Sequence, residues 1–290
     1  MNSAARPHTT LIGPEALLSL IGSGAPVLVL DTSFDLADPA AGERAFLEGH
    51  LPGAQHVHLD RDLCGAKTGL NGRHPLPERS VFAATAGRLG ISSAMQVVVY
   101  DRQGAMFASR LWWMLRWLGH EAVAVLDGGW AAWQSIGGTV ESGAGATASP
   151  QPAYPMVAEP SPQAHTVDAR TLQSQLGRIA LIDARAPERF RGEVEPLDAQ
   201  AGHIPGARNR FFKDNLATNG RFKSAEALRA EFLALIGIRP TAEVVHQCGS
   251  GVTACHNLLA MAVAGFDGAA LYPGSWSEWS SDPSRPVARG

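Results

Sequence analysis

The chain has 290 residues, of which 45% are hydrophobic and 18% are charged, and its formal net charge at pH 7 is -3. These values are typical of a folded globular protein long enough for two domains, and they exclude a disordered chain. They give no electrostatic support for a nucleic acid or an anionic membrane as a partner, because no block of basic residues is present.

The N-terminal residues, MNSAARPHTT, show neither the basic segment nor the apolar core of a secretory signal peptide. No apolar run approaches the roughly 20 residues that a membrane-spanning helix needs. We therefore expect a cytoplasmic protein that binds no membrane and no nucleic acid. The cysteines are too few for a disulfide framework, and no Cys and His spacing matches a zinc site, so we expect no metal; they are Cys64, Cys248 and Cys255.

The first half of the sequence alternates between predicted strands and helices. The short β-branched runs at 27–31 and 97–101 predict buried parallel strands. The stretches PEALLSLIG (14–22) and VFAATAGRLG (81–90) have the apolar spacing of helices. Three tryptophans in RLWWMLRWLG (110–119) also have helical spacing, and we expect them to pack in a core or between domains rather than to form a stacking surface.

The second half repeats the motifs of the first half in the same order. VLVLD, GHLPGA, VVVYDRQGA and LDGGWAAW correspond to IALID, GHIPGA, VVHQCGSGV and LYPGSWSEW. A repeat of this kind indicates two copies of one structural unit. The first copy has Asp101 where the second has Cys248, so we expect only the second copy to carry a nucleophile.

Residues 141–165 separate the two copies. This stretch is rich in Gly, Ala, Ser and Pro and has neither helical nor strand periodicity, which predicts a linker. We therefore expect an α/β protein with a non-catalytic domain at 1–140 and a catalytic domain at 166–290. Each domain is expected to be an open, mainly parallel sheet flanked by helices.

The segment VVHQCGSGVTAC is predicted to be a strand, a loop and a helix, with Cys248 at the end of the strand and the helix beginning near Thr253. In open α/β sheets the ligand site lies beyond the carboxyl ends of the strands. Gly249 and Gly251 allow successive backbone N–H groups to turn inward, and the helix N-terminus adds partial positive charge. This setting favours a reactive thiolate, so we predict that Cys248 is a nucleophile; a buried structural cysteine is the alternative.

CGSGVTAC resembles the active-site loop of the 3-mercaptopyruvate sulfurtransferases in the tandem-domain rhodanese family, which also includes the thiosulfate sulfurtransferases. GHIPGA and GSWSEW are further motifs of that family, and the resemblance covers nearly the whole chain. It implies two rhodanese-like domains and a ping-pong cycle through a Cys248 persulfide, with no cofactor. The terminal sulfur of a persulfide is anionic, and backbone N–H groups of the loop can hold it; the loop residues are Gly249, Ser250, Gly251, Val252 and Thr253.

Positive charge for an anionic donor is expected from DARAPERFRG, residues 183–192. Arginine binds carboxylates and other oxyanions through a planar, bidentate fork. By resemblance, Arg189 matches a substrate-binding arginine of the mercaptopyruvate enzymes, and Arg185 is a second candidate. The alternative for both is an ion pair with Glu188 or Glu193 at the surface.

A second substrate arginine is usual in this family, in a Pro-Arg-Asp type segment, but this chain has Leu197 at that position. Arg208 and Arg210, which follow GHIPGA, are candidates to replace it. The departure from the family pattern leaves the identity of the donor open.

The resemblance also implies a proton relay that involves the first half of the sequence. Asp60 and His74 align with an Asp-His pair that joins the loop serine, here Ser250. The spacing between Asp60 and His74 is longer than in the animal enzymes. A structural or solvated His74 is the alternative, because the residue that follows it is a proline.

The predicted function is transfer of a sulfane sulfur from the small molecule 3-mercaptopyruvate to cyanide, a thiol or a thioredoxin-like acceptor. Thiosulfate:cyanide sulfurtransferase activity and a persulfide carrier for a protein partner are the alternatives. The uncharged Gly249 and Ser250 favour mercaptopyruvate, because thiosulfate-preferring enzymes tend to carry basic residues in this loop, whereas Leu197 favours the opposite. A cysteine phosphatase is disfavoured because Ala254 stands where the phosphate-binding arginine would be.

Overall fold

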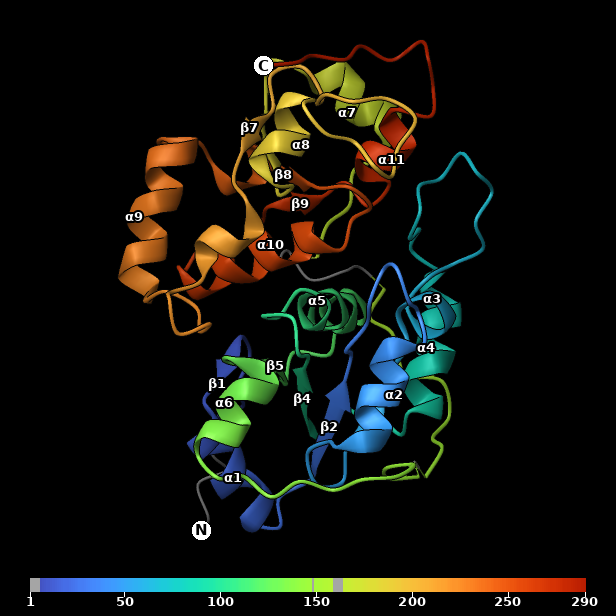
Figure 1. The fold of residues 1–290 in the computed structure, drawn as a ribbon, viewed down its shortest axis with the longest axis vertical. Coiled ribbons are helices and arrows are strands. Elements are labelled where there is room, and N and C mark those ends of the chain that lie inside the picture. The colour runs from blue at the N-terminus through green and yellow to red at the C-terminus, as the bar shows by residue number, and fades with distance from the viewer. Residues whose placement is uncertain (1–5, 148, 159–163) are drawn as a thin grey trace. The chain divides into compact units, whose positions relative to one another are not determined.

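The computed structural model describes residues 6–147, 149–158 and 164–290, and these form two compact units (Figure 1). The first unit consists of Met1–Leu63 and Arg79–Glu159, and the second of Cys64–Glu78 and Pro160–Gly290. Within the described residues, no helix is both long enough and apolar enough to cross a membrane.

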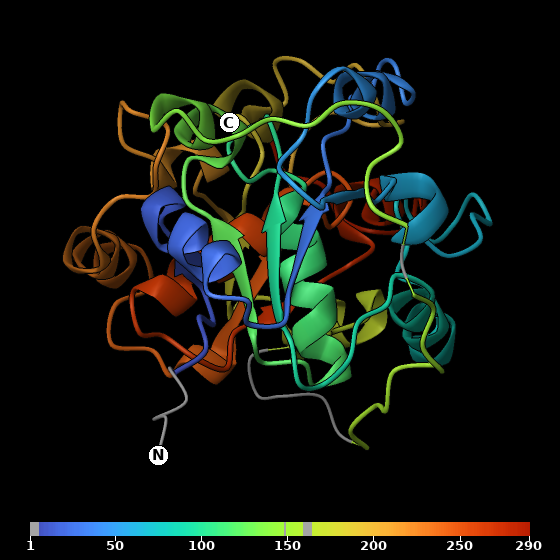
Figure 2. The ribbon, with the colours of Figure 1, turned by 90° about the horizontal axis from the view of Figure 1, so that it is seen from below.

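A five-stranded parallel sheet forms the centre of the first unit, in the order β1-β5-β4-β2-β3. Runs of Val and Leu give the central strands apolar side chains on both faces, as a sheet covered on both sides requires. In register, Val27 of β2 lies opposite Gln96 of β4, and Asp31 lies opposite Tyr100. Figure 2 shows β5, β4 and β2 side by side. The strands are β1 (Leu11–Ile12), β2 (Val27–Asp31), β3 (Gln55–His56), β4 (Gln96–Tyr100) and β5 (Val123–Leu126).

The longest helix of the first unit, α5, contacts β4 and β5, and all of its residues are buried. It includes Trp112, Trp113 and Trp117, which are therefore packing residues, as the sequence predicts. It ends at Gly119, whose φ of 96° is the left-handed conformation that glycine commonly provides after a helix. The helices are α1 (Pro14–Gly22), α2 (Ala41–Glu48), α3 (Leu59–Asp62), α4 (Arg79–Arg88), α5 (Ala108–Leu118) and α6 (Gly129–Ser135).

The second unit has a four-stranded parallel sheet in the order β7-β6-β8-β9. The helix α9 lies beside α10, which follows the central strand β8 (Figure 1). Side chains of Asp168 and Ser224 accept hydrogen bonds from the first turns of α7 and α9, so both helices begin at a capping residue. The strands are β6 (Ala180–Asp183), β7 (Arg208–Asn209), β8 (Val244–Gln247) and β9 (Ala270–Leu271). The helices are α7 (Ala169–Gln175), α8 (Pro187–Arg191), α9 (Ala225–Ile236), α10 (Thr253–Val263) and α11 (Ser275–Trp279), with short 3₁₀ turns η1 (Phe212–Asn215) and η2 (Thr241–Glu243).

The two sheets share one strand order. The series β5-β4-β2-β3 of the first unit corresponds to β9-β8-β6-β7 of the second. Thr166 also forms a parallel bridge to Leu271 of β9, as β1 pairs with β5. The sequence repeat is therefore a structural repeat, and the predicted fold class is confirmed.

Residues 64–78 depart from this simple division. They follow α3 of the first unit in the chain, yet they pack with the second unit. The N–H of Gly65 donates to the carbonyl of Pro75 at 2.9 Å, and the N–H of Arg73 donates to Ser277 Oγ of α11 at 3.0 Å. The sequence repeat gives no sign that this segment packs on the other unit.

The expected linker, 141–165, lies partly outside the described residues, which omit 148 and 159–163. Residues 141–147 and 149–158 pack on the first unit, whereas His165 belongs to the second unit, where its carbonyl accepts the N–H of Leu271 at 2.9 Å. Two backbone hydrogen bonds of 2.8 and 2.9 Å join Glu141 to His50, and the N–H of Tyr154 donates to the carbonyl of Ala83 at 2.9 Å.

Candidate active site

Cys248 directly follows β8, at the carboxyl end of the sheet, and α10 begins five residues later. Its side chain is 2% exposed, and Sγ accepts a hydrogen bond from the N–H of Gly251 at 3.1 Å. The start of α11 holds the loop in place. The N–H of Cys248 donates to Ser275 Oγ at 3.1 Å, and its carbonyl accepts from the N–H of Trp276 at 3.0 Å.

Two residues of this loop region have left-handed backbone conformations. Gly251 has φ of 78°, and a Cβ at this position would lie 2.4 Å from the carbonyl oxygen of Pro273, so the position requires glycine. Ser275 has φ of 54°, the same value as Gly129 at the matching place in the first unit. The Ser275 hydroxyl donates to the carbonyl of Tyr272 while it accepts from Cys248, which gives this serine a structural reason for its strained conformation.

The matching loop of the first unit holds a carboxylate. Asp101 Oδ1 accepts the N–H groups of Gln103 and Ala105, and Oδ2 accepts those of Phe107 and Ala108, all at 2.8–2.9 Å. Burial raises the pKa of Asp101, although these four donors favour its charged form. The repeated loop is therefore built to surround an anion at the position that Cys248 occupies in the second unit.

Ser250 and His74 lie together, as the sequence predicts for two members of the relay. His74 Nδ1 is 2.7 Å from Ser250 Oγ, and both side chains are buried within the second unit. This contact is possible because residues 64–78 belong to that unit. Asp60 lies on α3 of the first unit, and its part in a relay stays a prediction.

Arg189 lies on α8 and reaches the Cys248 loop. Its Nη2 donates to Glu195 Oε1 at 2.6 Å and to Asp198 Oδ2 at 3.3 Å. Its Nη1 lies 3.4 Å from the point that a Cβ on Gly249 would occupy. Its partners are therefore the buried Glu195 and Asp198, and not the surface residues Glu188 or Glu193 that were the alternative from the sequence.

Arg185 is buried and points into its own unit. It donates to both carboxylate oxygens of Asp183, to the carbonyl of Gly202 and to Glu195, at 2.7–3.4 Å. Its guanidinium also lies 4.8 Å from the centre of the Trp276 ring. These contacts make Arg185 a residue that organises Glu195, which in turn holds Arg189.

The two candidates that follow GHIPGA, Arg208 and Arg210, are both bound to groups of other segments. Arg208 donates to the carbonyl of Leu235, and Arg210 is bound to Asn215 and to Glu231. Arg73, which the sequence motifs do not single out, also lies beside the loop, with its Nη2 2.9 Å from the point that a Cβ on Gly249 would occupy. The available signal was its place directly before His74, a residue already expected at the site.

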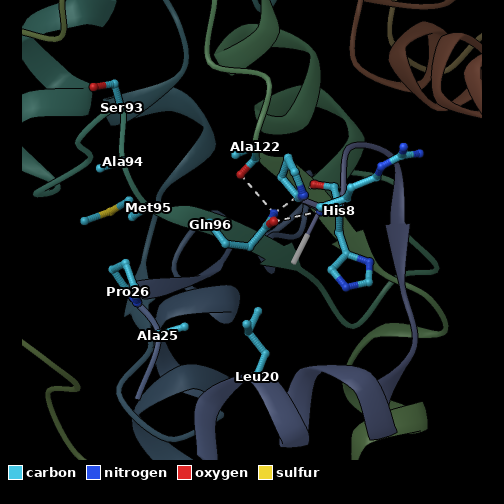
Figure 3. A pocket seen from close by; sticks show the side chains of 11 residues that line it. His8, Leu20, Ala25, Pro26, Ser93, Ala94, Met95, Gln96 and Ala122 are labelled. Carbon is cyan, nitrogen blue, oxygen red and sulfur yellow. Dashed lines mark hydrogen bonds between the residues drawn. The ribbon is translucent and has the colours of Figure 1, made fainter. Parts of the chain in front are cut away.

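A separate pocket of about 480 Å³ lies in the first unit, between residues 6–8, the end of α1 and the start of β4 (Figure 3). The Gln96 amide at its wall is bound to both backbone groups of His8 and to the carbonyl of Ala122, at 2.9 Å each. The pocket is at the amino ends of the strands, whereas ligand sites in such sheets lie at the carboxyl ends. None of the predicted site residues lines it.

The two parallel α/β units repeat one fold, with a cysteine that accepts a backbone N–H in the loop of one and an aspartate that accepts four in the same loop of the other. A model of the rhodanese-like domain matches residues 13–136 and 168–282. The chain therefore belongs to the rhodanese family, as the sequence motifs predict.

Known relatives agree with this family. The chain is 49% identical over 269 residues to a Pseudomonas aeruginosa protein named "Probable 3-mercaptopyruvate sulfurtransferase", which covers 91% of this chain and 93% of the relative. It is 45% identical over 283 residues to the Mycobacterium tuberculosis protein "Putative thiosulfate sulfurtransferase SseB", with 97% of each chain covered. The solved 3-mercaptopyruvate sulfurtransferase from Leishmania major aligns with a TM-score of 0.82 and 29% identity, over 96% of this chain and 76% of that one. The chain is a sulfurtransferase of the mercaptopyruvate or thiosulfate type, which confirms the predicted enzyme class.

Proposed function

We propose that this sulfurtransferase moves a sulfane sulfur from 3-mercaptopyruvate to a thiol or cyanide acceptor through a persulfide on Cys248. The observation that carries the proposal is the Cys248 loop, in which Gly251 N–H points at Sγ while the same loop of the first unit surrounds a carboxylate with four N–H groups. A loop of this kind favours the thiolate before transfer and the anionic persulfide after it.

In the first half-reaction the Cys248 thiolate attacks the donor sulfur. An S–S bond forms as the carbon–sulfur bond of mercaptopyruvate breaks, and the electron pair of that bond passes to the carbon next to the carbonyl, giving an enolate. The enolate takes a proton and leaves as pyruvate. We assign the His74–Ser250 pair to this proton, because Ser250 lies in the Cys248 loop and its 2.7 Å contact with His74 can pass a proton between the two side chains. The proposed role of Asp60 is to orient His74.

In the second half-reaction an acceptor attacks the terminal sulfur of the persulfide. A thiolate forms a new S–S bond to that sulfur, or cyanide forms a carbon–sulfur bond, and in both cases the Cys248 thiolate is released. A thioredoxin-like dithiol can then release sulfide by closing its own disulfide. The proposed reaction involves no nucleic acid and no membrane.

Thiosulfate is the second candidate donor. The observation that favours it is the positive charge of two guanidinium groups beside Gly249, which suits a dianion even though the loop itself is uncharged. The similarity to the Mycobacterium tuberculosis relative supports the same choice.

Initial rates with each donor test the proposal. We expect sulfur transfer from 3-mercaptopyruvate, with cyanide and with a dithiol as acceptors, to have the larger kcat/KM, and Cys248→Ser to lose at least about a thousandfold of it without a change in melting temperature. The intact protein should gain the mass of one sulfur atom when the donor is added without acceptor. Transfer by the Cys248→Ser protein near the normal rate would refute the nucleophile, a larger kcat/KM for thiosulfate would change the donor, and loading without turnover would favour a carrier.

A cytoplasmic location belongs to this proposal as well. No disulfide joins any two of Cys64, Cys248 and Cys255, all of which lie in the described residues, and a persulfide cycle needs Cys248 in its reduced form. Free thiols persist in the reducing conditions of the cytoplasm.

A further inference from the structure

The segment 64–78, which places His74 beside the cysteine loop, contacts the second unit at the start of α11. The N–H of Arg73, the residue before His74, donates to Ser277 Oγ at 3.0 Å. The same hydroxyl donates its proton to the carbonyl of Gly274 at 3.1 Å, which orients its oxygen as an acceptor. Ser277 therefore holds the backbone directly before His74.

Ser277 also holds the cysteine loop, through its backbone. Its N–H donates to the carbonyl of Gly249 at 2.9 Å. Gly249 precedes Ser250 in the chain, as Arg73 precedes His74. Each side chain of the 2.7 Å contact between His74 and Ser250 is therefore one residue away from a bond to Ser277.

The segment meets α11 too closely for a side chain at position 72. Gly72 has φ of 84°, and a Cβ there would lie 2.7 Å from the carbonyl oxygen of Gly274 and 3.1 Å from Ser277 Oγ. Gly69, in the same segment, has φ of 85°, but a Cβ there would meet no described atom within 4 Å. The requirement for glycine at position 72 is therefore one of space as well as conformation, and it comes from the contact with α11.

We propose that Ser277 is a positioning residue for the proton step, which acts by fixing His74 at hydrogen-bonding distance from Ser250. This inference rests on the proposed function, in which the His74–Ser250 pair delivers the proton. Proton transfer between two side chains requires heavy atoms within about 2.6–3.2 Å, so a small displacement of residues 64–78 away from the loop would slow this step.

The two candidate donors differ in their need for a proton, which separates this role from a purely structural one. Attack on mercaptopyruvate breaks a carbon–sulfur bond and gives an enolate, whose carbon must take a proton before pyruvate leaves. Attack on thiosulfate breaks a sulfur–sulfur bond, and the electron pair leaves with sulfite, which needs no proton. Loss of position at His74 should therefore slow sulfur loading from mercaptopyruvate alone, whereas a disturbed cysteine loop should slow loading from both donors.

Single-turnover loading of Cys248 at saturating donor tests the proposal with the full chain. The reaction is stopped at a series of times without acceptor, and the persulfide is detected by the added mass of one sulfur atom. We expect Ser277→Ala to slow loading from mercaptopyruvate about five- to tenfold, the effect of one hydrogen bond of ordinary strength, and to leave loading from thiosulfate within about twofold of the parent. Alkylation of Cys248 by iodoacetamide, which releases iodide and also needs no proton, gives a second reference. Ser277→Thr, which keeps the hydroxyl, should restore most of the rate.

Ser281→Ala is the matched control for Ser277→Ala. Both serines donate to the carbonyl three residues before them, but the hydrogen bond of Ser281 stays within its own turn of chain. Ser281→Ala should therefore load from both donors at the parent rate. Within the segment, Gly72→Ala should slow loading from mercaptopyruvate at least as much as Ser277→Ala does, whereas Gly69→Ala, which has the same conformational cost and open space for its methyl group, should not.

His74→Asn separates the positioning role from the proposed function. It removes the group that transfers the proton, so it should slow loading from mercaptopyruvate more than Ser277→Ala does. If His74→Asn slows this loading and Ser277→Ala does not, or if Ser277→Ala slows loading from both donors equally, the positioning role is overturned. If neither variant slows it, the proton assignment is refuted as well, and a parent protein that loads from neither donor would refute the proposed function together with the step that Ser277 serves.

Discussion

At the scale of single residues, the candidate site depends on backbone geometry more than on a set of charged side chains. The N–H of Gly251 donates to Cys248 Sγ, and the N–H of Cys248 donates to Ser275 Oγ. Both residues have positive φ. The conformation of the loop is therefore determined by two residues that do not themselves react.

Gly251→Ala tests this dependence. The new methyl group would lie 2.4 Å from the carbonyl oxygen of Pro273, so the loop must move and the N–H bond to Sγ must lengthen. We expect a loss of stability of about 2 kcal/mol and a fall in kcat of at least about tenfold. Urea unfolding and initial rates measure the two effects.

Gly268→Ala is the matched control, because Gly268 also has positive φ, at 93°, but its added Cβ would meet no atom closer than 3.5 Å. It carries the conformational cost without the collision. Equal losses of stability and activity in the two variants would mean that the contact with Pro273 has no special role.

The sequence predicts some of these residues well and others not at all. The Cys248 loop was predictable because strand, glycine-rich loop and helix are consecutive in the chain, and the helix does begin at Thr253. Arg73 was not, because it is 175 positions before Cys248 in the sequence and reaches it only through the packing of residues 64–78 on the second unit. Arg185 was expected near the donor, but no local pattern shows that buried Asp183 and Glu195 take up its donors.

At the scale of elements, the two copies of the strand–loop–helix unit use one backbone for different side chains. β4 and β8 both lie at the centre of their sheets, and the residue after each strand is the one surrounded by the loop. In the first copy that residue is Asp101 and in the second it is Cys248. In the first copy the loop surrounds a carboxylate with N–H groups, and our proposal is that in the second copy the same loop stabilises the thiolate of Cys248.

β8 differs from β4 in a second position. His246 lies opposite Ile182, as Val99 lies opposite Leu30, and both are fully buried. Burial lowers the pKa of His246 to about 3, and Met261 Sδ lies 2.9 Å from its Nε2. The folded protein thus keeps this imidazole neutral at pH values where an exposed histidine is charged.

The low pKa of His246 predicts a loss of stability in acid. The unfolded chain takes up a proton below about pH 6.5, but the folded chain does so only near pH 3, so unfolding becomes more favourable as the pH falls through this window. The difference between the two pKa values corresponds to on the order of 5 kcal/mol of stability. We expect His246→Leu, measured by urea unfolding at a series of pH values, to lose distinctly less stability between pH 6.5 and 4 than the parent.

The exposed His165 provides the control for this titration. His165→Gln should follow the parent curve, since this side chain is in contact with water in both the folded and the unfolded protein. Parallel curves for the parent and His246→Leu would show that His246 does not contribute to the acid sensitivity.

At the scale of the whole molecule, the repeat predicted the two sheets, their parallel strands and their helices. That success has a physical basis, because buried parallel strands need continuous apolar runs, and these are visible in one sequence. The packing of residues 64–78 on the second unit was not predictable in this way. Its anchors are single hydrogen bonds such as Arg73 N–H to Ser277 Oγ, which leave no periodic pattern.

The packing of residues 64–78 on the second unit has a consequence for unfolding that can be measured. Leu17 of α1 and Leu172 of α7 occupy matching places in the two units, and each is fully buried in the core of its own unit. Replacing a buried leucine with alanine costs about 2–5 kcal/mol, so each variant should weaken mainly the unit that contains it. Hydrogen exchange then reports which segments open together.

We expect Leu172→Ala to speed amide exchange in residues 64–78 along with the second unit, while Leu17→Ala should speed exchange in α1, β2 and β4 and leave 64–78 closer to the parent. The reporting amides are Gly65, which donates to Pro75, and Arg73, which donates to Ser277. If the amides of residues 64–78 instead followed the exchange rates of the first unit in both variants, the segment would unfold with the unit that surrounds it in sequence. Arg73 and His74 would then not be fixed beside Cys248, because the packing that holds them there is the packing this experiment measures.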